Sequence, residues 1–444
     1  MTGDKNARKT MSPRSVGNAI ANGLSRCRLS TARVLGTLDL IVEKEIRHNL
    51  VSYKFSIITV LTTILILASI FVMYRDYGLA RENYEILASG GGAAVIPPTP
   101  LSIFAKGLDE NLCRAHEMGF GQRISASSKQ QSVNDLFKLF TVPDLLYIIK
   151  VILSLCAMLF AFDMISGEKE AGTLRQTLSG SLGRPILITG KWLGGFTSFI
   201  LPLFLAVLLG TAFVALQPRV AMSPQDWARL GLFLLSGVIY LAVFFSLGLL
   251  ISCLTHESSS SLVVSLFAWT VLVFLIPNLG NILARQFVEI PTVQQLELRR
   301  QQIAIRAWQE VNLLPDWPER KTRLERARVE GDQVTEDYRN RFERLVSLSQ
   351  NITRVSPTAS FTFLATDLMG TGMLEEGRLK KAVVKYMFPS EDEQQRERPK
   401  FSYQRASCRE ALGRGGLNNL LLLVLFDLLF FATTYVVFLW YDVR

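Results

Sequence analysis

Charged residues and histidine are scarce in this chain of 444 residues. Lys, Arg, Asp and Glu make up 19% of the sequence, whereas a soluble globular protein carries about 25%. Histidine occurs only three times. The pair His256-Glu257 begins like a zinc-protease helix, but Ser260 stands where the second metal ligand is needed. These shortages argue against a cytosolic enzyme and predict no metal site.

Motifs for nucleotide binding and for nucleophilic catalysis are also missing. The segment from Gly183 to Lys191 ends like a phosphate loop, but six residues separate its glycines instead of four. Trp192 also replaces the Ser or Thr that would bind Mg²⁺. Ser181 lacks the spacing of a nucleophile elbow, and no histidine lies near it in sequence. We therefore expect no catalytic activity and no cofactor in this chain.

Long apolar runs are abundant. Hydrophobic residues make up 49% of the chain, and the mean hydropathy is +0.27. A transmembrane helix needs about 20 mostly apolar residues, and six runs of this length are apolar on all sides, unlike the striped helices around a soluble core. These runs are Phe55–Tyr74, Asp144–Phe162, Trp192–Leu216, Leu230–Leu254, Leu262–Leu283 and Leu417–Trp440. The sequence predicts an all-α membrane protein with six transmembrane helices.

The net charge of +10 favours a membrane over nucleic acid, because the basic residues lie beside the apolar runs. Residues 1–54 show no secretory signal and contain more basic than acidic residues. The basic residues there are Lys5, Arg8, Lys9, Arg14, Arg26, Arg28, Arg33, Lys44, Arg47 and Lys54. Both termini are therefore expected in the cytoplasm. Six crossings then place residues 75–143, 217–229 and 284–416 outside, and residues 163–191 and 255–261 inside.

The two long outer segments differ in pattern. In residues 75–143, Ala88–Pro100 and Gln122–Gln131 predict loops around a small element. In residues 284–416, two charge-rich stretches, Pro291–Leu313 and Pro318–Ile352, predict helices separated by a break that contains proline. Acids and bases alternate along these stretches, and a line of apolar residues follows one side of the second. This pattern predicts a largely helical extracytoplasmic domain with a solvated hairpin, not a nucleic-acid site.

The five cysteines are divided between the two sides of the membrane. Only Cys113 and Cys408 fall in the long outer segments, where an oxidising compartment would permit a disulfide. The hypothesis is a Cys113–Cys408 bond, and the alternative is two unpaired thiols.

One acidic residue lies in the middle of an apolar run. Asp427 is far from either end of the sixth run, and an ionisable residue in a membrane faces another helix or a water-filled cavity. It is therefore either part of a transport route or a hydrogen-bonded residue inside the bundle.

The loop after the second run carries the most information. It contains S-G-E-K-E-A-G-T-L from Ser166 to Leu174, with Leu178 four residues further on. Ser166 stands where it could cap a helix with acidic residues in its first turn, Leu174 and Leu178 share a face, and Gly183-Arg184-Pro185 would end it. We predict a short amphipathic helix at the inner membrane surface, which either binds a partner or simply lies on the membrane.

This loop resembles that of the ABC-2 type transporter permeases, which reads E-x-E-x-G-T-L and continues with R and then G-K at the next span. The matching residues are Glu168, Glu170, Gly172, Thr173, Leu174, Arg184, Gly190 and Lys191. In that family the loop is the coupling helix, which docks in a cleft of the ATP-binding subunit. The resemblance implies a coupling role for Glu168, Lys169, Glu170, Gly172, Thr173, Leu174, Leu178 and Arg184.

Two further segments are similar to the family. Residues 43–50 resemble its amphipathic elbow helix, with Glu45 and Arg47 among the charged residues and an apolar face that includes Ile41 and Ile46. Residues 356–371 resemble a segment of members that carry a large loop before the last helix.

The resemblance implies a permease of the cytoplasmic membrane of a prokaryote that moves a substrate, by export. It would pair with a second copy or a related permease and with separate subunits that bind ATP and Mg²⁺. The enlarged outer segments leave the substrate open. They also allow an ATP-driven mechanotransmission or assembly scaffold that contacts an extracytoplasmic protein and transports nothing. A membrane enzyme is a further alternative, opposed by the missing motifs.

Overall fold

The computed structural model describes residues 36–89, 94–113, 115–119, 123–127, 143–180, 183–387 and 401–441. Several sequence predictions concern residues outside these ranges. They are the basic residues from Lys5 to Arg33, most of the Gln122–Gln131 loop, and residues 181–182 directly before the predicted helix end at Gly183.

The described residues contain six helices that are long and apolar enough to cross a membrane. Each contains most or all of one predicted run. They are α2 (Tyr53–Ser89), α5–η2–α6 (Leu145–Tyr147, Ile148–Leu153 and Ser154–Ala161), α9 (Arg184–Ala215), α10 (Pro224–Leu254), α11–η3–α12 (Ser258–Thr270, Val271–Leu275 and Ile276–Phe287) and α17–η4–α18 (Cys408–Ala411, Leu412–Gly416 and Leu417–Trp440). The prediction of a helical membrane protein with six spans is confirmed.

Several helices begin before the apolar run because polar residues supply the start signal. Pro224 occupies the first turn of α10, where its missing N–H costs no hydrogen bond. Ser223 and Asp226 form a capping box there, in which each side chain accepts a hydrogen bond from the other residue's backbone N–H. The predicted start at Leu230 marks where the apolar run begins, and the helix itself starts six residues earlier.

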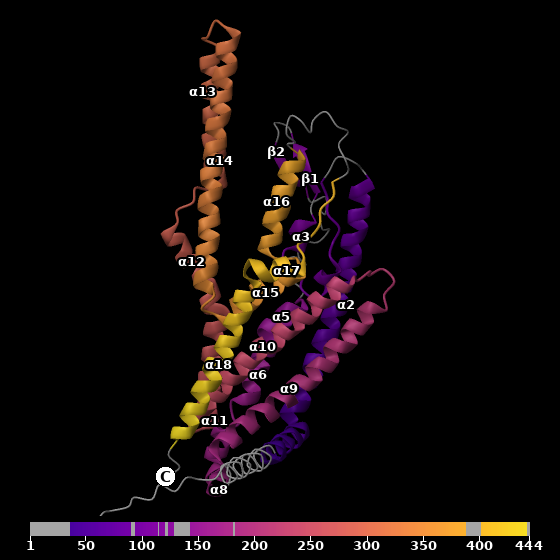
Figure 1. Cartoon of the computed structure of the whole chain (residues 1–444), viewed down its shortest axis with the longest axis vertical. Helices are drawn as coiled ribbons and strands as arrows, with labels where there is room; N and C mark the ends of the chain where they lie inside the picture. The colour runs from indigo at the N-terminus through magenta and orange to yellow at the C-terminus, as the bar shows by residue number, and fades with distance from the viewer. Residues whose placement is uncertain are drawn as a thin grey trace, which may run out of the picture.

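Helix α10 lies at the centre of the bundle (Figure 1) and packs against α6, α15 and α18. In the most apolar 18-residue stretch of α10, 78% of the residues are buried inside the protein. The corresponding share is 22% for α2, 17% for α11–η3–α12 and 11% for α17–η4–α18. The last three helices therefore present apolar side chains to their surroundings, as a lipid environment requires.

A helical hairpin extends from one end of the bundle (Figure 1). It consists of α13 (Val293–Val311) and α14 (Trp317–Thr353), which pack on each other, and α14 also packs on α12. Thr292 and Gln295 form a capping box at the start of α13, and Pro318 lies in the first turn of α14. The two helices lie where the charge pattern predicts them.

Residues from the two long outer segments form one small unit beside this hairpin. It contains α3 (Asp109–Leu112), the antiparallel strands β1 (Ala115–Gly119) and β2 (Arg123–Ser127), and α16 (Met373–Met387). The preceding η1 (Pro100–Ile103) packs on the main core of the bundle instead. A separate apolar core joins Ile96 and Leu112 to Leu379 and Val383. Beside it, Arg405 contacts Asp109 at 2.9 Å and donates to the Gly370 carbonyl. The two outer segments therefore do pack together, through an apolar core and an ion pair and not through the Cys113–Cys408 bond that the sequence analysis proposes.

The predicted disulfide is not present in this unit. Cys113 and Cys408 both carry free thiols. Cys113 packs on the core of the small unit, whereas Cys408 packs on the main core of the bundle. The two cysteines therefore contact different apolar clusters, and the alternative of two unpaired thiols describes this structure.

Helix α15 (Pro357–Met369) is buried in the bundle, although the sequence analysis grouped it with the outer domain. It packs against α10 and α18, and Phe361 stacks on Tyr240 with ring centres 4.5 Å apart. Ser356 caps its start, and Gly370 ends it with a φ of +67°, in the left-handed region that favours glycine. Residues 284–416 are thus not a purely external domain.

Candidate coupling site

The loop between α6 and α9 lies at the opposite end of the bundle from the hairpin (Figure 1) and forms two short helices instead of one. These are α7 (Ser166–Glu170) and α8 (Thr173–Ser179). Gly172 separates them with a φ of +71°, and its Cβ position is empty, so backbone conformation and not space requires glycine there. Gly183, Arg184 and Pro185 do not end the loop helix, because Gly183 is the N-cap of α9.

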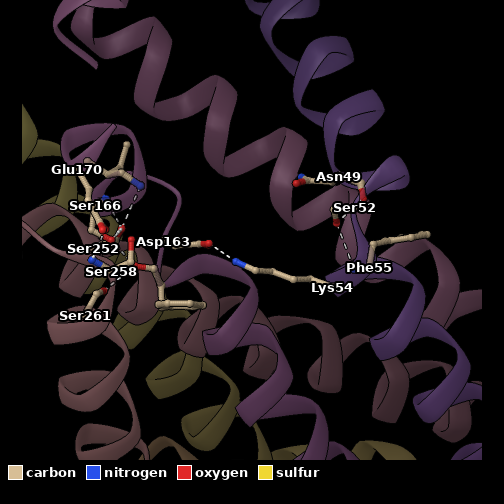
Figure 2. A network of polar contacts seen from close by, with 12 residues as sticks. Asn49, Ser52, Lys54, Phe55, Asp163, Ser166, Glu170, Ser252, Ser258 and Ser261 are labelled. Carbon is tan, nitrogen blue, oxygen red and sulfur yellow. Dashed lines mark hydrogen bonds and ion pairs between the residues drawn. The ribbon is translucent and has the colours of Figure 1, made fainter. Parts of the chain in front are cut away.

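Two serines on α10 and α11 hold the start of α7 and the turn before it (Figure 2). Ser252, at the end of α10, accepts hydrogen bonds from the backbone N–H groups of Ile165 and Ser166, at 3.0 and 2.9 Å. Ser261 on α11 donates to the Phe162 carbonyl. Ser166 does not cap α7 as predicted, because its hydroxyl donates back to the same Phe162 carbonyl. A neighbouring helix therefore satisfies two N–H groups at the start of α7.

Two charged residues of α7 bind the ends of neighbouring helices. The Lys169 ammonium donates to the carbonyls of Cys253 and Thr255 at the C-terminal end of α10. Glu170 accepts from the backbone N–H of Ser258 at the start of α11, at 3.1 Å (Figure 2). Each charge has the sign that stabilises the helix end it contacts. Helix α7 is thus fixed to both α10 and α11.

A buried ionic cluster joins the loop to α9 and to the elbow helix, which covers residues 36–51. The Lys191 Nζ atom lies 3.1 Å from Glu45 Oε1 and 2.9 Å from Glu168 Oε1. The side chains of Lys191 and Glu45 are only 4% and 10% exposed. Charges so far from water are stable only when they are paired. Lys191, Glu45 and Glu168, hereafter the Lys191 cluster, therefore hold three segments together.

Two glycines allow the elbow helix to approach α9 closely. A Cβ atom at Gly190 would lie 2.7 Å from Ile41 Cγ2, and one at Gly194 would lie 2.7 Å from Glu45 Cβ. Such distances are too short for any side chain. Glycines four residues apart in an apolar helix are a known signal of close helix packing, and this signal could have predicted the contact from the sequence.

The other residues predicted for this site are placed differently. Arg47 is exposed and pairs with Glu43 on its own helix. The Arg184 guanidinium donates to the carbonyls of Leu439 and Tyr441 at the end of α18. Leu174 is 3% exposed, and Leu178 packs against the bundle core. The predicted apolar face therefore contacts this protein's own bundle.

The free surface of the loop is small and polar. Among the loop residues that the structure describes, the exposed ones lie along the turn between the helices and along the outer side of α8. They are Glu170, Ala171, Gly172, Thr173, Arg175, Gln176, Ser179 and Gly180. We call this set the α8 surface. Of the predicted coupling residues, Glu170, Gly172 and Thr173 belong to it, whereas Glu168 and Lys169 anchor the loop from behind.

Asp427 lies in a chain of hydrogen bonds inside the bundle. It accepts a hydrogen bond of 2.7 Å from Ser246 on α10, and Ser246 accepts one of 2.9 Å from the indole N–H of Trp192 on α9. The contacts join α18, α10 and α9. They agree with the second sequence interpretation, in which Asp427 is a hydrogen-bonded residue of the bundle.

Comparison with known proteins places the chain in a family. Two relatives are similar over part of their length, both described as a probable ABC transporter permease protein NosY. The protein from Pseudomonas aeruginosa is 34% identical over 140 residues, which cover 30% of this chain and 49% of the relative. The one from Stutzerimonas stutzeri is 33% identical over 134 residues, covering 29% and 47%. The chain spans about half the length of these relatives. The family profile of the ABC-2 family transporter proteins matches residues 40–443, so the chain belongs to that family.

Proposed function

We propose that this protein is the transmembrane permease subunit of an ABC transporter that exports a substrate across the cytoplasmic membrane of a prokaryote. A separate subunit would bind ATP and Mg²⁺ and hydrolyse the nucleotide. The observation that carries the proposal is the loop between α6 and α9, where α7 is fixed to the bundle and α8 presents a free polar surface. Family membership agrees with this role.

The contacts suggest how force would pass from the ATPase into the membrane. A push on the α8 surface reaches α7 across the Gly172 turn. From α7 it passes to α10 through Ser252, to α11 through Glu170, and to α9 and the elbow helix through the Lys191 cluster. To move a two-state equilibrium from 1:99 to 99:1, the ATPase must favour one state by about 5.5 kcal/mol. Because the loop is bonded to several helices, this free energy can change the arrangement of the helices and is not lost in a rearrangement of the loop alone.

The proposal includes an orientation and a second permease copy. The loop and the elbow helix would face the cytoplasm with both termini, and the hairpin would face the opposite side. The membrane-exposed helices α2 and α18 offer apolar side chains such as Ile57, Ile64, Leu421 and Leu428, each more than half exposed. Lipid or the same helices of a second permease would cover these side chains.

The α8 surface can be tested by copurification from the native host. Mild-detergent purification of the wild type, followed by mass spectrometry, should recover an ATP-binding subunit. Substituting Arg175→Glu and Gln176→Glu should abolish this recovery, because both side chains are exposed and the changes reverse the local charge without opening the fold. The matched control is Arg326→Glu, exposed on the hairpin. Absence of an ATPase from the wild type, or equal recovery with the loop variant, would contradict the proposal.

A second function, the mechanotransmission scaffold, is favoured by the hairpin. Helix α14 packs directly on α12, the end of a membrane span, and the hairpin tip exposes Trp308, Leu313 and Trp317 by 60%, 85% and 72%. A motion of the bundle would therefore move a surface suited to binding another protein. Replacing all three residues by Ser distinguishes the two functions. A scaffold should lose its activity, because its partner no longer binds, whereas a transporter should still move its substrate across the membrane.

A further inference from the structure

Two π-helical segments lie in adjacent membrane helices near the hairpin end of the bundle. They are η2 (Ile148–Leu153) and η3 (Val271–Leu275). A π-helical turn costs free energy because it misaligns backbone hydrogen bonds, and such turns are frequent at functional sites. Both segments contribute side chains, Lys150 and Val273, to the same cavity.

Neighbouring side chains hold both segments in this conformation. The Lys150 carbonyl accepts hydrogen bonds from Tyr240 at 2.8 Å and from Ser154 at 2.7 Å. In η3, the Leu272 carbonyl accepts from Ser356 and the Phe274 carbonyl from Asn278, at 2.5 and 2.8 Å. The carbonyls displaced by the irregular turns are thus satisfied by side chains from other turns and other helices. The arrangement is built into the fold and is not a local distortion.

The cavity has a volume of about 540 Å³ and lies between η2, η3, α12, α14 and α15. Most of its wall is apolar and includes Phe342, Leu345 and Phe363. The charged residues in its lining are Lys150 and Arg285, and both are basic. Neither lies within ion-pair distance of an acid in the part of the chain that the structure describes, and Lys150 Nζ lies 5.7 Å from the Tyr147 ring centre. Lys150 is half-buried in the apolar wall and Arg285 is exposed, so an anion bound between them would pair with both charges.

A second cavity, of about 660 Å³, adjoins the first because Arg285, Phe342 and Leu345 line both. It is more polar and contains two further arginines, Arg299 and Arg341, the latter paired with Asp337, and one further acid, Glu289. The combined groove therefore changes from apolar to polar along its length. Its outer wall, α12, exposes Ile282 and Phe287 by 55% and 74%, so a molecule could enter from surrounding lipid.

We propose that this groove binds an anionic amphiphile, whose phosphate or carboxylate is held by Lys150 and Arg285 and whose apolar chain lies against Phe342 and Phe363. The site is at the opposite end of the bundle from the α8 surface, and it does not depend on the proposed coupling function. A lipid of the surrounding bilayer is one source of this chemistry, and a free organic anion is the other.

The test uses the purified full-length chain in detergent and two fluorescent lipids with identical chains, phosphatidylglycerol and phosphatidylcholine. Phosphatidylglycerol should bind more tightly, because only its headgroup carries a net negative charge. Lys150→Gln and Arg285→Gln should each weaken its binding by about tenfold or more, as expected for the loss of a charge-assisted hydrogen bond. Lys150→Arg should restore binding, and the matched control Lys321→Gln, exposed on the hairpin, should leave it unchanged.

Several outcomes would overturn the proposal. These are equal binding of the two lipids, no binding by the wild type, and unchanged affinity in both Gln variants. Competition by glycerol 1-phosphate that equals competition by the whole lipid would show a site for a free anion and not for an amphiphile. The thermal transition of each variant shows whether it is folded. Because Arg285 is exposed, its variant remains informative even where Lys150→Gln destabilises the protein.

Discussion

Ion pairs occur at both ends of this molecule, but they are buried at the loop end and exposed on the hairpin. At the loop end, Lys191 is buried between Glu45 and Glu168 from two other segments. On the hairpin, Arg339 pairs with Glu336 and Arg341 with Asp337, all half or more exposed and within one turn of the same helix. Buried charges stabilise only as a complete set, whereas exposed pairs contribute little. The loop end is therefore held in one arrangement by its charges. In the hairpin these exposed pairs contribute little, and a different pair, Arg323–Glu310, joins α13 to α14.

The largest effect is expected from breaking the Lys191 cluster. Lys191→Met leaves two carboxylates next to each other without a counter-ion and should cost about 3–5 kcal/mol of stability. The measurement is the thermal transition of the detergent-purified protein. Adding Glu45→Gln and Glu168→Gln to the same variant should recover part of the loss, because no unpaired charge then remains. A single variant as stable as the wild type would show that the cluster does not hold the segments together.

A buried charge near the hairpin end, Asp367, tests whether burial alone sets how much a charged residue changes the stability of the protein. It lies on α15 near the hairpin end, where burial and the nearby Glu375 raise its pKa to about 7, while Arg354 opposes the shift. Because the folded pKa exceeds the ordinary value, folding favours the protonated form. The contribution of Asp367 to stability is therefore fully present below about pH 4 and is lost as pH rises to about 7.

The upper bound for this loss is about 4 kcal/mol, from about 1.4 kcal/mol per pKa unit. The transition temperature should thus fall between pH 5 and pH 8, and Asp367→Asn should flatten that decrease. Identical pH profiles for the variant and the wild type would show that other groups cause it.

A smaller effect is expected where the elbow helix meets α9. Gly194→Ala would place a methyl group 2.7 Å from Glu45 Cβ, and such overpacking costs about 1–3 kcal/mol. Gly331→Ala on the hairpin is the matched control, because nothing lies within 4 Å of its Cβ position. There the change should stabilise the helix by up to about 1 kcal/mol. Effects of the same sign at both glycines would argue against the close contact.

The smallest effect is expected for the exposed ion pairs of the hairpin. Arg339→Ala removes a pair whose side chains are 56% and 53% exposed, and the cost should be about 0.5 kcal/mol or less. High salt should reduce even this difference, since exposed charges are screened. A loss comparable with that of Lys191→Met would remove the distinction between the two ends.

Local patterns were enough to predict much of this fold. Each membrane span contains a run of apolar residues, and the hairpin helices lie where alternating charges and Pro318 indicate them. The loop was recognised as the candidate site from its E-x-E-x-G-T-L motif. Its division at Gly172 was missed, because glycine in that motif was read as a family feature and not as a backbone position that requires positive φ.

Contacts between distant segments could not be predicted in the same way. Leu174 and Leu178 were correctly assigned to one face, but hydrophobicity alone does not show whether that face contacts a partner or the protein's own bundle. Cys113 and Cys408 illustrate the same difficulty, because sharing one side of the membrane did not bring the two thiols into one cluster.

The number of membrane spans, the approximate ends of most of them and the position of the hairpin follow from the residue pattern alone. These features depend on hydropathy, caps and prolines, which act within a few residues. By contrast, the contact between Lys191 and Glu45, 146 residues apart in sequence, and the entry of α15 into the bundle are set by how the helices pack. Such pairings depend on which helix faces meet, and in a helix buried on many sides each face is nearly equally apolar, so the sequence pattern does not select one.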